Sequence, residues 1–556
     1  MHMTLKSLTP AFALIAAICG CGRALAEPAA QERSLTELRN TVVNLLQALV
    51  DRGVLTREQA QAMVRDAQEK AAAETAANAA AEQQREKEEA NAVRVPYVPE
   101  IVKDEISKQV VAELGPSVKK EVVQEISSSG SLRSALPDWV REMTWTGDVR
   151  VRGEGDLFAH DNAVNTYLDF NQINTKGGIE RAGSSALLNT EEEQNRMRLR
   201  LRYGFDLELG SGWSAALRLA TGSTGEIIAT TNQTLGTYGA GYQITADQGY
   251  IRWTGQSSSE RQIFTVTAGR FENPWVSTDL IWYNDLTFEG ATAAYRVNLS
   301  SDSAHRHDLF ATVGGFPLTS FSPFDSDPTD KQKWLTAAQV GADFSTDNDS
   351  QIRFGAAYYD YIHIVGQRNS LDSTLYNWTA PAFVQKGNSV FDISNPSNPT
   401  ANPVNLFALA SDFRIVDLIA LANLHLSSRY SLGFTLEALD NVGFKTADVM
   451  ARTGYYVAPR TRGYRADIGF GSSTVGPFGA WHASFGYRYL QRDAVLDAFN
   501  DEDFHLGGTD AKGYTVLFDF SFNPRVWLRL KYMSANEIDG PPLGIDVWQV
   551  DMNTRF

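Results

Sequence analysis

Residues 196–209 read RMRLRLRYGFDLEL and alternate strictly between two kinds of side chain. Every second residue, from Met197 to Leu209, is apolar or aromatic, and the residues between them begin with four arginines. Because successive side chains of a strand point to opposite faces, this pattern predicts a β-strand with one apolar and one charged face. Such a strand suits a soluble sandwich, and equally an outer-membrane barrel in which the charged face lines a wet lumen. The rest of the chain decides between them.

Length and composition narrow the choice. The chain has 556 residues, a formal net charge of −16 and 11% aromatic residues. Its mean hydropathy of −0.26 argues against an α-helical membrane protein, and its negative charge argues against a nucleic acid as partner. After residue 26 no stretch stays apolar for the roughly 18 residues that a spanning helix needs. If the protein crosses a membrane, it therefore does so as a barrel.

The first 26 residues predict a secretory signal peptide. Lys6 precedes the apolar run AFALIAAI at residues 11–18, and Ala-Leu-Ala at 24–26 forms a cleavage site. The alternative is a lipoprotein-type cleavage around Cys19 and Cys21, which are the only two cysteines in the chain. Under the favoured cleavage the mature chain has no cysteine, so it has no disulfide and no thiolate metal site.

Residues 27–134 are expected to form a periplasmic helical or coiled-coil region with a linker. Leucine and valine recur at helical spacing over residues 35–50, and a second apolar series runs over residues 106–126. Thr56 and Gln59 form a capping box between them. Such stripes suit either a coiled coil between subunits or a solvated tether with one apolar face.

From residue 135 to residue 556 the apolar period changes from about 3.6 to 2, which predicts a transmembrane antiparallel β-barrel of about 16 strands. The links after even-numbered strands are short or moderate, as in Gly-Ser-Gly at 210–212, whereas several links after odd-numbered strands are long, notably 156–194, 362–413 and 440–462. Outer-membrane barrels sort their loops in this way, with short turns in the periplasm. The expected strands are residues 145–154, 196–209, 213–220, 246–254, 262–270, 288–299, 309–316, 337–344, 351–361, 415–426, 430–439, 463–471, 481–490, 514–522, 526–533 and 546–556.

Four stretches carry a family resemblance. They are LVDRGVLTREQA at 49–60, LPDW at 136–139 leading to WTGDVRVR at 145–152, AGRFENPW at 268–275, and TDLIW at 278–282. With the overall layout they resemble the putative porin family, Gram-negative outer-membrane barrels with an N-terminal helical region. The resemblance implies a diffusion channel and supplies no solute. The final strand, from Trp548 to the terminal Phe556, resembles the signal that the barrel assembly machinery reads.

Ten inward arginines are the candidate pore lining. The strand at 196–209 places four of them roughly 7 Å apart on one face, and nearby strands add the others. In trimeric general porins the third external loop folds inward, and here that loop carries Glu272, Asp279 and Asp285. We expect it to face the arginines and set up a transverse field, the alternative being that acid and arginine simply pair to stiffen the wall. The ten are Arg150, Arg152, Arg196, Arg198, Arg200, Arg202, Arg218, Arg252, Arg296 and Arg353.

Other features are expected to have plainer roles. Aromatic residues near strand ends suit interfacial girdles, and the acidic loops, such as 501–503, suit solvated charge better than Ca²⁺ or lipopolysaccharide bridging. His305 and His307 lack a third ligand, so neither a metal nor a cofactor is expected. No catalytic motif is present, and an enzyme is not expected; His425 and His482 are the candidates if the barrel were a lipid hydrolase.

The sequence thus predicts an outer-membrane porin for small hydrophilic solutes or ions, with its helical region in the periplasm. Expected partners are outer-membrane lipid and lipopolysaccharide, the assembly machinery, two further copies in a homotrimer, and peptidoglycan as a candidate. The alternative is a structural tether whose helical region binds peptidoglycan or a periplasmic partner.

Overall fold

The computed structural model describes residues 143–222, 231–257, 261–300, 307–320, 331–346, 350–398, 405–472 and 475–556. The expected signal peptide, residues 1–26, and helical region, residues 27–134, lie outside these ranges, as does His305.

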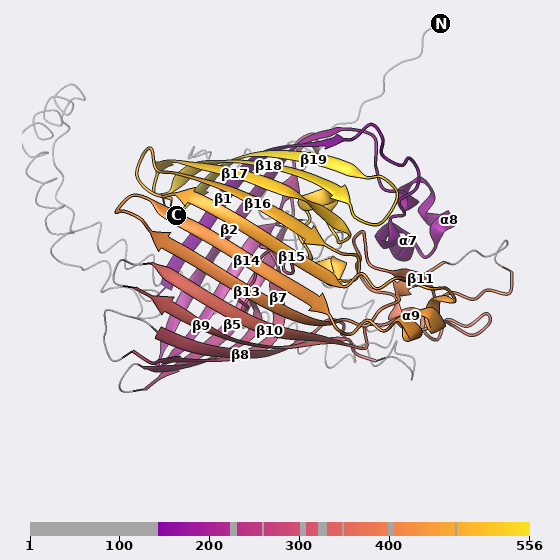
Figure 1. Cartoon of the computed structure of the whole chain (residues 1–556), viewed down its shortest axis with the longest axis horizontal. Coiled ribbons are helices and arrows are strands. Elements are labelled where there is room, and N and C mark those ends of the chain that lie inside the picture. The colour runs from indigo at the N-terminus through magenta and orange to yellow at the C-terminus, as the bar shows by residue number, and fades with distance from the viewer. Residues whose placement is uncertain are drawn as a thin grey trace, which may run out of the picture. The chain divides into compact units, whose positions relative to one another are not determined.

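One antiparallel sheet closes on itself, because β1 pairs with both β2 and β19 (Figure 1). The sheet has 17 strands, of which β4 has only two residues, so sixteen long strands form the barrel wall. A separate two-stranded sheet, β11 with β12, lies in a long link. The strands are β1 (Met143–Phe158), β2 (Gln194–Gly210), β3 (Trp213–Thr221), β4 (Gln233–Thr234), β5 (Ile244–Gln256), β6 (Gln262–Glu272), β7 (Thr287–Asn298), β8 (His307–Pro317), β9 (Trp334–Ser345), β10 (Gln351–Ile362), β11 (Val390–Asp392), β12 (Phe407–Leu409), β13 (Arg414–His425), β14 (Ser431–Asn441), β15 (Arg462–Gly471), β16 (Trp481–Leu490), β17 (Ala511–Asn523), β18 (Val526–Glu537) and β19 (Gly544–Arg555).

Each of the sixteen expected strands is confirmed, and the barrel is the fold that the alternation predicts. The main difference is length. For example, β1 continues to Phe158, where it still pairs with Ile545 of β19. The ladder runs on past the stretch where alternation is clear, because backbone pairing continues wherever a neighbouring strand is available.

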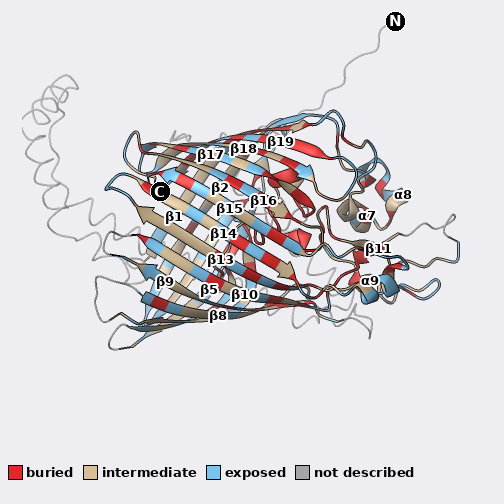
Figure 2. Cartoon of the chain, in the orientation of Figure 1, coloured by how far each residue is buried: buried red, intermediate tan, exposed pale blue. Residues whose placement is uncertain are grey.

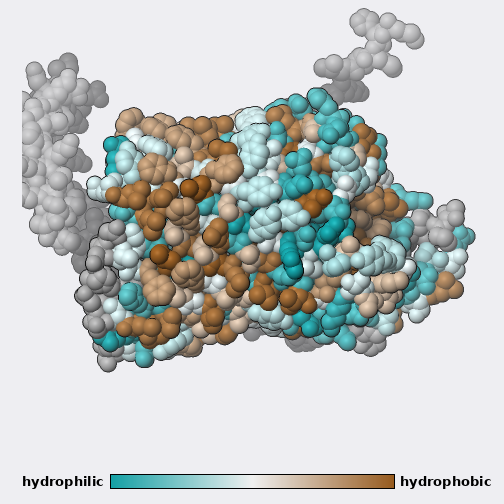
Figure 3. Space-filling view, viewed as in Figure 1, coloured by the Kyte–Doolittle hydropathy of each residue, from teal (hydrophilic) through white to brown (hydrophobic). Residues whose placement is uncertain are grey.

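The two faces of the wall differ as the alternation predicts (Figure 2). On β2 the outward side chains of Met197 and Tyr203 are 55% and 44% exposed, whereas the inward Arg198 is 8% exposed. Figure 3 shows hydrophobic residues spread over the strand wall. Aromatic pairs stack on the outer face near strand ends, such as Trp145 on Tyr203 with ring centroids 5.4 Å apart, as interfacial girdles require.

The links are short at one end of the barrel and long at the other. The β2–β3 turn consists of Ser211 and Gly212, both with positive φ, which matches the right-handed twist of a two-residue hairpin. The helices and 3₁₀ turns lie in the longer links: α7 (Phe170–Lys176), α8 (Ile179–Ala182), η1 (Gly183–Ala186), η2 (Asn377–Thr379), α9 (Thr446–Thr453), η3 (Asp497–Phe499) and η4 (Phe504–Leu506). Within the described residues, no helix is both long and apolar enough to span a bilayer.

Candidate pore lining and inward segments

Six arginines share the inner face of two neighbouring strands, and we call them the arginine wall: Arg150 and Arg152 on β1, and Arg196, Arg198, Arg200 and Arg202 on β2. The register sets Arg150 opposite Arg200 and Arg152 opposite Arg198. Like charges directly opposite one another destabilise a sheet unless anions compensate them.

Carboxylates of β1 provide part of that compensation. Asp148 contacts Arg200 at 2.9 Å and Arg202 at 2.6 Å. Farther along the strand, Glu154 and Asp156 each lie 2.7 Å from Arg196. The alternation that repeats arginine on β2 also places these acids on the facing strand.

The link between β6 and β7, residues 273–286, crosses the inside of the barrel, and we call it the first inward segment. At its end, Asp285 contacts Arg200 at 3.0 Å and Arg202 at 3.4 Å. Burial raises the pKa of the Asp285 carboxyl, but Arg200, Arg150 and Arg202 outweigh it, so the pKa lies below its usual value. Asp285 is thus held as a carboxylate against the arginine wall.

The beginning of the same segment contacts the opposite part of the barrel. The backbone of Val276 forms two hydrogen bonds with the Gln339 side chain of β9, at 2.9 and 2.8 Å. The Thr278 amide donates to Glu437 of β14 at 3.1 Å, and Asp279 lies 2.5 Å from Arg488 of β16. Since one short segment contacts β2, β9, β14 and β16, it must pass through the barrel interior.

The link between β16 and β17, residues 491–510, also folds inward, and we call it the second inward segment. Asp503 contacts Arg152 at 2.8 Å, and Glu502 lies 3.5 Å from Arg198. Burial raises the pKa of the Asp503 carboxyl. The nearby cations Arg152, Lys531 and Arg198 lower it by more, so the pKa lies below its usual value. The expectation of solvated loop charge at 501–503 is therefore wrong, because these acids balance the arginine wall and Asp501 is only 2% exposed.

The two inward segments bind each other. The Tyr283 amide donates to the Phe499 carbonyl at 2.9 Å, and its hydroxyl donates to Glu502 at 3.2 Å. Asn500 donates to the Leu280 carbonyl at 2.6 Å. Beside these bonds Trp282 packs on Tyr359 of β10, with ring centroids 5.2 Å apart, within an apolar cluster inside the barrel.

A third link, between β10 and β13, supports the second segment from the loop end. Backbone amides of Gln385 and Asn388 donate to the Asp497 carboxylate at 3.3 and 3.4 Å. Burial raises the pKa of Asp497 to about 7 despite these bonds. Burial likewise raises the pKa of Asp493 to about 6, while it lowers that of His505, which also faces Lys386.

The structure brings together only part of the predicted lining. Asp285 meets the arginine wall, whereas Asp279 meets Arg465 and Arg488, which the sequence reasoning did not select. Glu272 is exposed and forms no ion pair with another described residue. Arg465 on β15 and Arg488 on β16 occupy inward positions of strands that alternate between apolar and polar residues, and this pattern could have identified them.

The remaining predicted arginines lie on other strands. Three of them contact carboxylates: Arg218 meets Asp247, Arg296 meets Asp308 at 3.0 Å, and Arg353 meets Asp343. Arg252 donates instead to the Thr267 hydroxyl at 3.3 Å. Most of the predicted arginines are thus paired, as the alternative of a stiffened wall requires.

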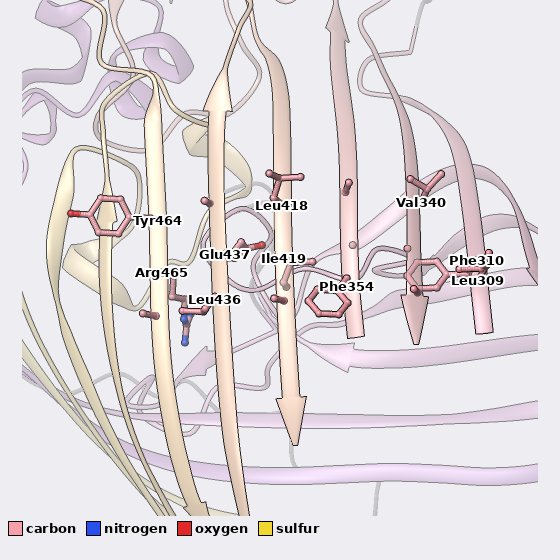
Figure 4. Close-up of a pocket in the computed structure, with 17 residues that line it drawn as sticks. Leu309, Phe310, Val340, Phe354, Leu418, Ile419, Leu436, Glu437, Tyr464 and Arg465 are labelled. Atoms are coloured by element: carbon pink, nitrogen blue, oxygen red, sulfur yellow. The ribbon is translucent and has the colours of Figure 1, made fainter. Parts of the chain in front are cut away.

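The hollows lie on both faces of the wall. One inner hollow of about 470 Å³ is lined by Arg353, His482 and Lys531, among others. Another hollow, of about 960 Å³, is bordered mainly by outward apolar residues such as Phe354 and Leu418, so it is a groove of the outer surface (Figure 4). Among the described residues, no group of three or more His, Cys, Asp or Glu side chains suits a metal ion.

The C-terminal strand closes the barrel. Trp548 and Phe556 point outward, 36% and 56% exposed. The backbone of Phe556 forms two hydrogen bonds with Gly147 of β1, each 2.9 Å. The terminal residue therefore completes the seam between the first and last strands.

Comparison with known proteins identifies the family. The family described as "Putative porin" matches residues 39–556, and the chain belongs to it. The resemblance seen in the sequence is thereby confirmed. No curated protein matches the chain.

Solved outer-membrane structures resemble the chain only remotely. OprB of Pseudomonas putida is 12% identical with a TM-score of 0.40, covering 78% of this chain and 97% of that one. The outer-membrane channel DcaP of Acinetobacter baumannii is 10% identical with a TM-score of 0.36, covering 74% and 97%. These likenesses are too distant to bear on mechanism or solute.

Proposed function

We propose that this member of the putative porin family lets small hydrophilic solutes or ions diffuse passively across the outer membrane. Its family and its closed barrel are those of an outer-membrane channel rather than of an enzyme. One observation carries the finer proposal: the charged inner face of the barrel is crossed by a segment tied to both sides, at Asp285 and at Thr278.

The proposed path runs along the inner wall beside the first inward segment. Side chains of Arg296, Arg353 and Arg529 on that wall are 37%, 38% and 40% exposed, which supports a wet lumen on this side of the segment. Each of these arginines is paired with an aspartate, so this surface is polar without a large net charge. We infer that the ten predicted arginines, with Asp279 and Asp285, shape this path.

The segment itself is held as a rigid constriction. Asp285 is 8% exposed, and its oxygens are shared between the arginine wall and the Thr231 hydroxyl, which donates at 3.0 Å. Charge-assisted bonds of this kind are worth roughly 1.5–3 kcal/mol each when buried. These contacts hold the end of the segment against the arginine wall.

Reconstitution in planar bilayers tests the proposal. Purified protein is expected to give stable ohmic current steps in KCl. Absence of current from correctly folded protein, judged by circular dichroism, would contradict it.

The remaining roles are proposals of the same kind. We assign assembly recognition to the strand ending in Trp548 and Phe556, a periplasmic position to residues 27–134, and a homotrimeric state to the barrel. Crosslinking in outer-membrane fragments tests the last of these.

A further inference from the structure

A hollow of about 360 Å³ on the inner face of β5–β9 lies beside the first inward segment. Its lining is rich in threonine, from Thr254 on β5 to Thr312 on β8, and we call it the threonine pocket. Pro274 and Val276 of the first inward segment form one side. The pocket therefore lies on the path proposed above.

Arg252 differs from its neighbours in this pocket. Arg296 contacts Asp308 at 3.0 Å and Asp343 at 3.7 Å. By contrast, no described carboxylate lies within ion-pair distance of the Arg252 guanidinium, which donates through Nε to Thr267 and lies 4.9 Å over the Tyr250 ring. The pocket thus contains one cation that the described part of the protein does not neutralise.

Hydroxyl groups continue from this cation across the wall. The strand registers set Arg252 opposite Thr267, and Thr267 opposite Thr292. Directly opposed residues stand roughly 5 Å apart, so the row spans about 10 Å. Thr292 is 7% exposed and belongs to the lining of the pocket, and its hydroxyl makes no hydrogen bond with a described residue.

The chemistry of this row selects a class of solute. A guanidinium offers paired donors that match a carboxylate, and a threonine hydroxyl both donates to and accepts from a solute hydroxyl. The volume lies within the range of small-molecule sites, and Phe310 with Val276 gives an apolar side for CH groups.

We propose that the threonine pocket is a binding subsite for hydroxylated monocarboxylates, with the carboxylate on Arg252 and hydroxyls along Thr267 and Thr292. This inference rests on the proposed channel function and adds a solute class to it. A carboxylate bound there enters the constriction already oriented, with its hydroxyl chain along the wall.

The test measures block of the KCl current by gluconate, with sorbitol as the uncharged probe of similar hydroxyl content. Wild-type protein is expected to be blocked by gluconate at a much lower concentration than by sorbitol. Arg252→Gln is expected to raise the half-blocking concentration of gluconate about tenfold and leave sorbitol unchanged, because it removes a charge-assisted bond. Arg525→Gln, in a periplasmic turn, is the matched control and is expected to behave as wild type.

Two further variants separate a built site from a general field. Arg252→Lys keeps the charge but loses the paired donors, so an intermediate affinity is expected. Thr292→Val is expected to weaken gluconate block and leave acetate block unchanged. Equal block by gluconate and sorbitol, or unchanged block in Arg252→Gln, would overturn the inference while current persists. Loss of all current from wild-type protein would instead count against the channel function.

Discussion

Replacing Asp285 by Asn removes one negative charge where the first inward segment meets the arginine wall. Asp285 lies 3.0 Å from Arg200, 3.4 Å from Arg202 and 4.0 Å from Arg150, so the local charge becomes more positive by one unit. An ion passing about 8 Å away in a wet pore experiences roughly 0.5 kcal/mol from that unit at a water-like dielectric constant. The energy of an anion falls and that of a cation rises by this amount, so the difference between them changes by roughly 1 kcal/mol. This corresponds to roughly a fivefold rise in the permeability of Cl⁻ relative to K⁺.

The assay is the reversal potential of reconstituted protein under a tenfold KCl gradient. The shift is expected to shrink in molar salt, because the Debye length falls to about 3 Å. Asp539→Asn, which alters a partly exposed carboxylate paired with Arg460, is the control and should leave the potential unchanged. If Asp285→Asn conducts normally with the wild-type reversal potential, ions do not pass this junction, and the placement of the path is refuted.

Three further predictions concern stability and assembly. Arg152→Met leaves Asp503 and Asp551 buried without the cation that they share. We therefore expect the free energy of unfolding, measured in urea, to fall by about 3–5 kcal/mol. The control is Arg462→Met at an exposed ion pair, which should lower it by less than about 0.5 kcal/mol. Burial raises the folded-state pKa of Asp497 to about 7, so the folded state holds a proton that the unfolded state has released, and this carboxyl makes stability fall as pH rises. Between pH 6 and pH 8 wild type should therefore lose roughly 1.4 kcal/mol more than Asp497→Asn, and equal losses in the two proteins would exclude this carboxyl. Phe556→Ala should lower the amount of barrel assembled in outer membranes, measured by heat-modifiable gel mobility, whereas Phe522→Ala, also exposed at the end with the short turns, should not.

The strands were predictable because their signal is local. Along β2 the alternation of apolar and charged residues is enough to predict which face each side chain lies on, so an outward position such as Met197 can be assigned without knowledge of the rest of the chain. Link lengths then predicted that one end of the barrel has short turns and the other long loops, as the structure has them. The family resemblance agreed with both, and the structure lengthened strands and added the short β4, β11 and β12.

The interior was harder to predict because its contacts join residues far apart in sequence. Arg152 and Asp503 are separated by 351 positions, and no local pattern marks 491–510 as an inward segment. An acidic run in a polar link has the same composition whether water or arginine neutralises it. Asp285 was selected because its loop has a known counterpart, whereas Arg488 was passed over because it lies within a strand of ordinary appearance.

Alternate side chains of one wall are expected to face lipid and water, and two neighbouring positions on β10 allow both faces to be probed in one strand. Because Cys19 and Cys21 both lie in the expected signal peptide, single cysteines can be placed at Arg353 and Phe354, which face inward and outward. A charged, membrane-impermeant thiol reagent is expected to label Arg353→Cys in reconstituted barrels and reduce their current, and to leave Phe354→Cys unmodified. Equal labelling of both variants, or labelling of Phe354→Cys alone, would show that the two faces of β10 do not meet lipid and water in this way.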